Sequence, residues 1–231
     1  MGTTSFLRPL ARLCQGLLRL VYPPRCIFCH TLLPRDREAL GYCSSCAQSL
    51  PWAYGEVRFL GNSMAPCVSA LWYGSGVRKS VLRYKFDNRD FYRRFYGPML
   101  RRALEESGFP APDYVTWAPL SRARRNRRGY DQAELLAREA ASLYGQRPVG
   151  LLRKVRNTRP QSSLSAGERR SNARDIYTVC GGLALQGCRV LLVDDMVTTG
   201  STLDQCAMAL LEAGAEAVYC LTLARSIHSS N

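Results

Sequence analysis

The chain has 231 residues, which is enough for one α/β domain plus a small additional unit. Hydrophobic residues make up 46% and charged residues 22%, a balance that excludes a disordered chain. The net charge of +14 is uneven, since residues 121–175 carry fourteen Lys and Arg against five Asp and Glu, whereas residues 176–231 carry two against five. A basic middle beside an acidic end suits a polyanionic ligand, and it suits nucleic acid equally.

Residues 1–22 predict an amphipathic helix, from Ser5 to about Leu20. Three arginines interrupt this segment, so it has neither the continuous apolar core of a secretory signal nor the length of a membrane span. We therefore expect a cytoplasmic, reducing location. The helix either packs on the rest of the chain or docks on a membrane surface or a partner.

Residues 23–52 contain two CxxC pairs, Cys26–Cys29 and Cys43–Cys46. Two such pairs converge readily on one tetrahedral Zn²⁺, whose binding contributes on the order of 10 kcal/mol to folding a unit too small for its own core. Because four thiolates close the coordination sphere, we expect the zinc to be structural and not catalytic. The alternative is a set of four buried cysteines without a metal.

Residues 53–231 predict one α/β domain, because short apolar runs that indicate strands alternate with longer periodic runs that indicate helices. The expected strands are Val68–Tyr73, Tyr114–Leu120, Tyr177–Cys180, Val190–Val193 and Ala217–Leu223. The expected helices are Val77–Phe86, Phe91–Glu106 and a third that starts at Asp131, with Glu134 as its capping-box partner, and ends at Gly145.

A basic segment joins the end of one predicted strand to the start of the next helix, on the ligand side of an α/β sheet. It places five arginines within residues 122–128, too many for an ordinary helix face. We expect four of them to serve a polyanion and not the fold: Arg124, Arg125, Arg127 and Arg128. A further basic stretch, Arg153–Arg174, predicts a mobile flap. Lys85 lies either at an anion or on a solvated helix face.

The most informative stretch is Val190–Thr202, with the sequence VLLVDDMVTTGST. Four apolar residues predict a buried strand, and Asp194 and Asp195 follow at its carboxyl end. The turn Thr198–Thr202 precedes a helix, so its hydroxyls and N–H groups suit a phosphate, and Gly200 lets the backbone approach it. Paired carboxylates instead suit ribose hydroxyls or a hydrated Mg²⁺. An ordinary strand–turn–helix connection is the alternative.

The two carboxylates are expected to repel one another, since no basic residue lies near them in the sequence. Such a pair costs stability until a ligand or a cation arrives. We therefore expect Asp194 and Asp195 to serve a ligand, and a double change to Asn to leave the fold intact or slightly more stable.

These residues resemble the phosphoribosyl pyrophosphate (PRPP) motif of type I phosphoribosyltransferases. With the cysteine pairs, they resemble the ComF/GntX family, whose members join a double-CxxC zinc ribbon to such a domain. The resemblance implies a type I phosphoribosyltransferase fold with a central, mostly parallel sheet. One departure is Asp131, where the family pattern has Asn. The resemblance covers nearly the whole chain beyond the first helix, and its landmarks are Cys26, Cys29, Cys43, Cys46, Tyr84-Lys85-Phe86, Pro119-Leu120, Arg128–Ala133, Pro160-Gln161, Arg170, Asn172 and Val190–Thr202.

The family resemblance also implies roles for site residues. Asp194 and Asp195 would hold the ribose hydroxyls and act as the catalytic carboxylates, with Mg²⁺ bound together with PRPP. Pyrophosphate would leave the anomeric carbon as an acceptor nucleophile arrives, through an oxocarbenium-like state. The Ala118–Pro119 bond is expected to be cis. The implied PRPP-binding residues are Asp194, Asp195, Thr198, Thr199, Gly200, Ser201, Thr202, Pro119, Leu120, Ser121, Arg122, Lys85 and Arg128.

Two other functions remain open beside phosphoribosyl transfer to an unnamed acceptor. In the first, the chain is a PRPP sensor that has lost turnover. In the second, it is a protein that binds single-stranded DNA during DNA uptake. The family implies a helicase as partner in the second case. A homodimer is also left open.

Overall fold

The computed structural model describes residues 21–155, 176–180 and 182–226. Contacts divide the chain into two compact units, Met1–Leu50 and Pro51–Asn231. The predicted N-terminal helix and most of the predicted flap lie outside the described residues, as do Pro160, Gln161, Arg170 and Asn172. Among the helices that are described, none combines the length and the apolar character needed to cross a bilayer.

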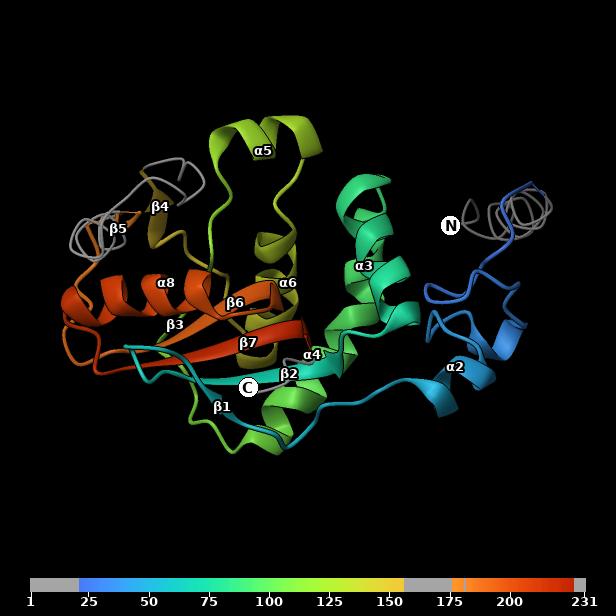
Figure 1. The fold of residues 1–231 in the computed structure, drawn as a ribbon, viewed down its shortest axis with the longest axis horizontal. Helices are drawn as coiled ribbons and strands as arrows, with labels where there is room; N and C mark the ends of the chain where they lie inside the picture. Colours follow the sequence, from blue (N-terminus) through green and yellow to red (C-terminus); the bar gives the residue numbers. More distant parts are fainter. Residues whose placement is uncertain (1–20, 156–175, 181, 227–231) are drawn as a thin grey trace, which may run out of the picture. The chain divides into compact units, whose positions relative to one another are not determined.

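The first unit is built around its cysteines. The first pair lies in a tight turn, in which the N–H of Cys26 donates to the carbonyl of Thr31 over 2.8 Å. The second pair opens the helix α2 (Ser44–Ser49), and the Cys43 sulfur caps it by accepting from the N–H of Cys46. A single 3₁₀ turn, η1 (Arg35–Arg37), lies between the pairs in the chain (Figure 1).

The second unit has a five-stranded sheet at its centre, as Figure 1 shows. Only the edge strand β1 runs antiparallel to its neighbour, so the sheet is mostly parallel, as predicted. The predicted strand at Tyr177 instead pairs with a second short strand in a separate antiparallel ribbon. In spatial order the sheet contains β1 (Arg58–Phe59), β2 (Pro66–Trp72), β7 (Ala217–Arg225), β6 (Arg189–Val197) and β3 (Tyr114–Trp117), and the ribbon contains β4 (Leu152–Lys154) and β5 (Tyr177–Val179).

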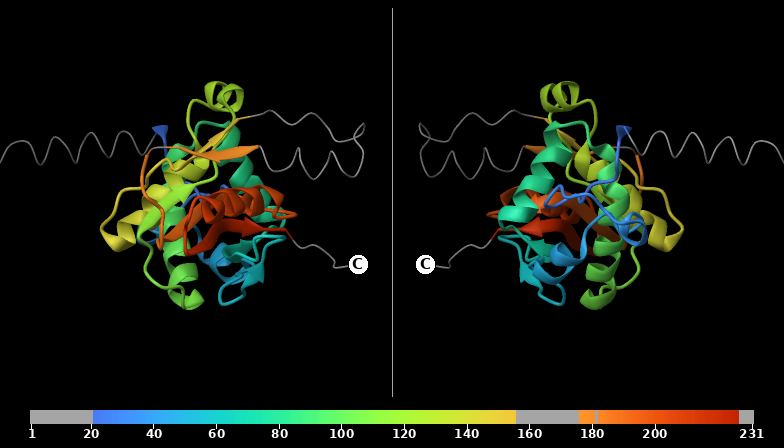
Figure 2. Two further views of the ribbon diagram at one scale, coloured as in Figure 1. Left: turned by 90° about the vertical axis from the view of Figure 1, so that its left-hand side faces the viewer. Right: turned by 90° about the vertical axis from the view of Figure 1, so that its right-hand side faces the viewer.

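Helices cover this sheet in two layers. One layer contains α4 (Arg93–Ser107), which packs on β2 and β7, and α6 (Gln132–Ala141), which packs on β6 and β3. The helix α8 (Ser201–Glu212) packs on β6, β7 and the ribbon strand β5. The short helix α5 (Arg122–Arg128) stands away from both layers, which is clear in both views of Figure 2.

The strand β6 is longer than its apolar run predicts. It continues through both aspartates to Val197, because β7 pairs with it along this length, with Asp194 opposite Thr222. Successive side chains of a strand point to opposite faces. Val190 and Leu192 lie in one core cluster with apolar residues of α8, so the even-numbered positions of β6 face α8.

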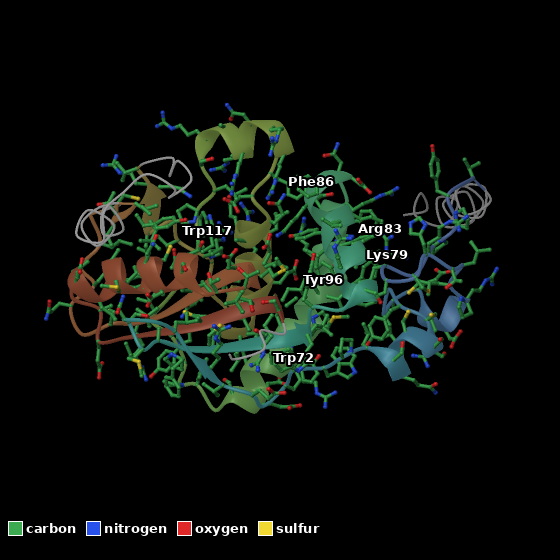
Figure 3. All side chains as sticks on the ribbon, in the orientation of Figure 1. Trp72, Lys79, Arg83, Phe86, Tyr96 and Trp117 are labelled. Carbon is green, nitrogen blue, oxygen red and sulfur yellow. The ribbon has the colours of Figure 1, made fainter. Side chains whose placement is uncertain are left out.

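The helix α3 (Ser75–Phe86) is held beside α4 by buried aromatic residues. The hydroxyl of Tyr96 hydrogen-bonds that of Ser80 over 2.7 Å, and its ring packs edge-on against Tyr84. Figure 3 labels Tyr96 and, at the end of α3, Phe86. Burial of two tyrosines fixes the end of α3 that carries Lys85 and Phe86. The remaining short elements are η2 (Asp90–Tyr92), which leads into α4, and η3 (Ser142–Tyr144), which follows α6.

Candidate functional site

The segment Thr198–Thr202 leads from β6 into α8, as predicted: residues 198–200 connect the two elements, and Ser201 and Thr202 begin the helix. Gly200 has φ of +88°, and a Cβ there would come within 2.9 Å of the side chain of Leu60, so this position requires glycine. The hydroxyls of Thr199 and Ser201 lie 3.0 Å apart. With Asp194 these residues line a hollow of about 40 Å³ at the N-terminus of α8, where N–H groups without helical partners favour an anion.

The two aspartates point in different directions. Asp194 lies on the α8 side of β6, and its Oδ1 accepts from the backbone N–H of Asp195 over 2.7 Å. The carboxylate of Asp195 lies 2.8 Å from the ammonium of Lys85 on α3, and both side chains are largely buried. The expectation that nothing offsets the pair is therefore wrong for Asp195, whose cationic partner is 110 positions away in the sequence.

Asp194 has a strongly perturbed pKa. Burial raises its pKa well above the usual value, and the negative charge of Asp195 adds to this effect. The hydrogen bond from the N–H of Asp195 and the charge of Lys85 act in the opposite direction. A carboxylate held in this way gains most when a cation or hydroxyl donors arrive to satisfy it.

A second hollow, of about 150 Å³, lies beside the first and shares Asp194 and Thr202 with it. It brings together residues from α3, the β3–α5 segment, β6 and the ribbon. Its lining includes most of the predicted PRPP-binding residues outside the turn, but Arg122 is not part of it. The full lining is Lys85, Ala118, Pro119, Leu120, Ser121, Arg124, Arg128, Lys154, Tyr177, Asp194, Asp195 and Thr202.

Two residues of this lining were not predicted. Lys154 and Tyr177 come from the ribbon strands β4 and β5, and the ammonium of Lys154 lies 5.3 Å from the centre of the Tyr177 ring. Burial lowers the pKa of Lys154, and the charge of Arg124 lowers it further. The sequence held only a weak signal for them, because Lys154 falls in a stretch interpreted as a flap. One further expectation is wrong: the described peptide bonds include no cis bond, at Ala118–Pro119 or elsewhere.

The basic segment forms a helix, α5, capped by the hydroxyl of Ser121, and its arginines divide into two kinds. Arg124 and Arg128 line the second hollow. Arg128 also bonds the side chain of Gln132 and lies over the ring of Phe86 at 4.9 Å, while its Nε is buried without a partner among the described residues. Arg125 pairs with Glu134 on α6. Arg125 thus has an exposed ion pair within the fold, and the expectation that these four arginines serve a polyanion stays a prediction.

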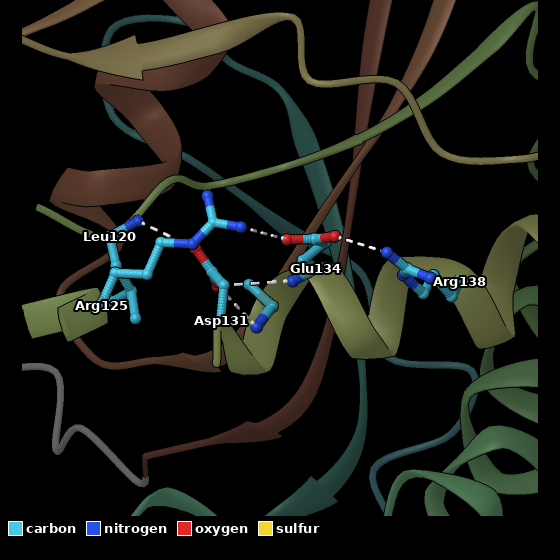
Figure 4. A network of polar contacts seen from close by, with 6 residues as sticks. Leu120, Arg125, Asp131, Glu134 and Arg138 are labelled. Carbon is cyan, nitrogen blue, oxygen red and sulfur yellow. Dashed lines mark hydrogen bonds and ion pairs between the residues drawn. The ribbon is translucent and has the colours of Figure 1, made fainter. Parts of the chain in front are cut away.

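Asp131 ties the start of α6 to the loop that lines the second hollow (Figure 4). One carboxylate oxygen accepts from the N–H groups of Ala133 and Glu134, and the other accepts from the N–H of Leu120 over 3.2 Å. Burial raises its pKa despite these bonds. The Glu134 carboxylate accepts hydrogen bonds from Arg125 and Arg138, as Figure 4 shows. The predicted capping box differs, because in it Glu134 would bond back to the N-cap residue.

The four cysteines of the CxxC pairs form a cluster in the first unit. Their sulfur atoms all lie within 4.8 Å of one another, and none is in a disulfide. Four thiols at such distances match the donor set of a tetrahedral zinc site. They are Cys26, Cys29, Cys43 and Cys46, as predicted.

Comparison with known proteins gives matches along most of the chain. Residues 126–230 match the family model described as "Phosphoribosyl transferase domain". The "DNA utilization protein YhgH" of Salmonella typhimurium is 35% identical over 230 residues, covering 90% of this chain and all of that protein. The "Competence protein F" of Haemophilus influenzae is 27% identical over 93% of this chain and 90% of that protein. The "Competence protein ComFC" of Streptococcus pneumoniae is 31% identical over 66% of this chain and 65% of that protein.

Among solved structures, one match is the glutamine PRPP amidotransferase from B. subtilis. It is 24% identical, with a TM-score of 0.44, over 61% of this chain. The matched part covers 30% of the amidotransferase, so this chain corresponds to less than a third of that enzyme.

Proposed function

Since this chain belongs to the ComF/GntX family of proteins with a phosphoribosyltransferase domain, we propose that it binds PRPP with Mg²⁺ and transfers the phosphoribosyl group to an acceptor. One observation carries the proposal. The two adjoining hollows share Asp194 and Thr202, and together they offer a hydroxyl-rich helix N-terminus, carboxylates and several cations. A 5′-phosphate, a ribose and a pyrophosphate require these three kinds of group, in this order along the molecule.

Each residue then has a role set by its chemistry. The turn Thr198–Thr202 binds the 5′-phosphate, and Asp194 accepts hydrogen bonds from the ribose hydroxyls. Asp195 positions Lys85 through their 2.8 Å ion pair. The loop Pro119–Ser121 approaches the pyrophosphate.

The cations of the second hollow serve the leaving group. As the bond from the anomeric carbon to pyrophosphate breaks, negative charge grows on pyrophosphate, and Arg124 and Arg128 stabilise it. The partnerless Nε of Arg128 is one donor available for this purpose. Asp194 is the acid that fits Mg²⁺, because Asp195 already has a cationic partner and hard cations prefer carboxylate oxygens. The metal would neutralise charge on pyrophosphate.

Calorimetric titration with Mg²⁺ and PRPP tests binding, and exchange of labelled pyrophosphate into PRPP, with a library of nucleobases, tests turnover. We expect binding that Asp194→Asn weakens strongly and exchange that depends on an acceptor. Binding without exchange under any acceptor would favour a PRPP sensor. A folded wild type that binds neither PRPP nor a 5′-phosphorylated ribonucleotide would refute the proposal.

Binding of single-stranded DNA is the second candidate function. The relatives are named for competence and DNA utilization, and the arginines of α5 from Arg122 to Arg127 are exposed. Phosphate contacts weaken steeply with salt, so oligonucleotide affinity measured between 50 and 200 mM salt, about the range in which such contacts are lost, tests this function. A helicase partner and a homodimer belong to the same hypothesis, and co-purification from a competent cell tests them.

We also propose that the cysteine cluster holds one structural zinc ion, supported by four free thiols within 4.8 Å of one another. Free CxxC thiols suit a reducing compartment, so we place the protein in the cytoplasm. Metal analysis of protein purified without an affinity-tag metal should find one zinc per chain. A disulfide between these cysteines and no zinc would refute the assignment.

A further inference from the structure

The edge strand β1 contacts the outer side of the Thr198–Thr202 turn through one arginine. The guanidinium of Arg58 donates to two successive carbonyls of the turn, that of Thr198 over 3.0 Å and that of Thr199 over 3.2 Å. The two partners lie 140 and 141 positions away in the sequence, so no sequence pattern connects them. Arg58 lines neither hollow, and its two bonds therefore act on the backbone of the turn.

Peptide geometry gives these two bonds a consequence for ligand binding. In a trans peptide the carbonyl and the N–H point in opposite directions. The Thr198 carbonyl shares its peptide with the N–H of Thr199, and the Thr199 carbonyl shares its peptide with the N–H of Gly200. Carbonyls held toward Arg58 therefore turn both N–H groups away from it. Neither N–H donates a hydrogen bond within the described part of the chain.

The rest of the β1–β2 hairpin supports the same turn. The side chain of Leu60 lies against Gly200, so that its Cδ2 would be 2.9 Å from a Cβ at that position. The carboxylate of Asp204, in the first turn of α8, accepts from the N–H groups of Asn62 and Ser63 over 3.2 and 2.8 Å. The hairpin thus holds the turn before any ligand arrives, which reduces the ordering cost of binding.

We propose that Arg58 is a positioning residue for the phosphate subsite. Its two hydrogen bonds to the Thr198 and Thr199 carbonyls orient the Thr199 and Gly200 N–H groups toward a bound 5′-phosphate. The inference rests on the proposed function and adds to it a residue that never touches the ligand. A planar guanidinium with several donors in a fixed fork can hold two carbonyls together, whereas a lysine ammonium on a flexible stem lacks that fixed geometry.

The test compares two probes that occupy different parts of the site, ribose 5-phosphate and inorganic pyrophosphate. In Arg58→Met we expect affinity for ribose 5-phosphate to fall about tenfold or more, because two N–H groups lose their orientation. Affinity for pyrophosphate should stay within about twofold, since its proposed subsite lies at Arg124 and Arg128. Arg58→Lys keeps the charge without the fork, and it should lose most of the same affinity. Arg78→Met, which removes an exposed arginine on α3, is the matched charge control.

Amide chemical shifts give a readout that a merely structural role would not change. In the wild type, ribose 5-phosphate should shift the ¹⁵N–H signals of Thr199 and Gly200, and these shifts should shrink in Arg58→Lys. If Arg58→Met does not fold, Arg58→Gln, which can still donate to one carbonyl, replaces it in the comparison.

The outcomes separate the inference from the proposed function. If the wild type binds neither PRPP nor ribose 5-phosphate, the proposed function fails. If the wild type binds both and Arg58→Lys binds them equally well, only the role of Arg58 is refuted. An equal loss for ribose 5-phosphate and pyrophosphate would also overturn it, because it would show a general effect of charge or folding.

Discussion

The two units of the chain are stabilised by different means. In the first, the described residues bury few apolar side chains, namely Cys26, Ile27, Phe28 and Leu50, and its main long-range feature is the cluster of four thiols. In the second, apolar side chains from β6, β7 and α8 form an extensive core. The second unit also pairs charges across great sequence distances, as in Lys85 with Asp195.

This difference separates what each unit needs in order to fold from what it can use for function. A metal ion with four sulfur ligands has no open position for a substrate, so such a site stabilises the fold and does not catalyse a reaction. A sheet stabilised by burial can place charged groups at the carboxyl ends of its strands, where α/β proteins bind ligands. Variants that affect one unit and spare the other test this division.

Loss of the metal should have the largest effect, and it should be confined to the first unit. Cys43→Ser removes one of four ligands from a site whose zinc contributes on the order of 10 kcal/mol to folding. We expect the zinc content to fall from one per chain to nearly none, and amides of residues 24–50 to lose their protection from hydrogen exchange. PRPP affinity should change less than about twofold. The control Cys188→Ser lies outside the cluster and should keep its zinc.

Asp195→Asn should have the next largest effect, and it acts in the second unit. The change leaves the ammonium of Lys85, which is 15% exposed, without its carboxylate, and breaking a largely buried ion pair costs about 3 kcal/mol. Urea unfolding measures this loss. The double variant Lys85→Met with Asp195→Asn should recover much of it, because no buried charge is left unpaired. A single variant as stable as the wild type would show that the pair does not support the fold.

The arginines of α5 test whether the second unit uses its charges on a ligand. Arg124→Gln with Arg128→Gln removes the two that line the hollow, and PRPP affinity should fall about 100-fold, since each charge-assisted bond contributes roughly 1.5 kcal/mol. Arg122→Gln with Arg127→Gln makes the same charge change on the same helix, outside the hollow, and should cost less than about threefold. If both double variants lost affinity equally, for PRPP and for oligonucleotides, the result would favour a nucleic acid that binds along the whole of α5.

Local patterns predicted much of this architecture, and they failed where distant segments meet. The CxxC pairs and the strand, turn and helix of Val190–Thr202 each depend on neighbours in the sequence, so their residue types identify them. The contacts of Arg58 and Lys85 depend on the strand order of the sheet, which no local pattern encodes. The same limit explains β6, whose extension through the aspartates follows from pairing with β7.

The aspartate pair shows the same limit, because the sequence places the two residues side by side but does not reveal the partner of Asp195. Strand alternation sends Asp194 and Asp195 to opposite faces, and only Asp195 meets a lysine. The two neighbouring carboxylates therefore have different surroundings. Asp195 is paired with Lys85, and the proposed ligand contact falls to Asp194.

Asp194→Asn should have the smallest effect on stability, and the sign should be opposite to that of Asp195→Asn. Because burial and the charge of Asp195 raise the pKa of Asp194, the folded state binds its proton more tightly than the unfolded chain does. This contribution to the unfolding free energy is fully present below the unfolded pKa of about 3.9 and is lost as pH rises through the folded pKa. Asn carries no charge to desolvate and can still accept from the Asp195 N–H.

The variant should therefore lack this decline and exceed the wild type by about 1 kcal/mol at pH 7, while its PRPP affinity falls sharply. Urea unfolding of both proteins between about pH 4 and pH 8, a range that starts near the unfolded pKa, measures the difference. A difference that does not change with pH would mean that Asp194 does not titrate within this range. A variant less stable than the wild type at pH 7 would show that its charge supports the fold, and that both members of the pair, not Asp195 alone, are structural.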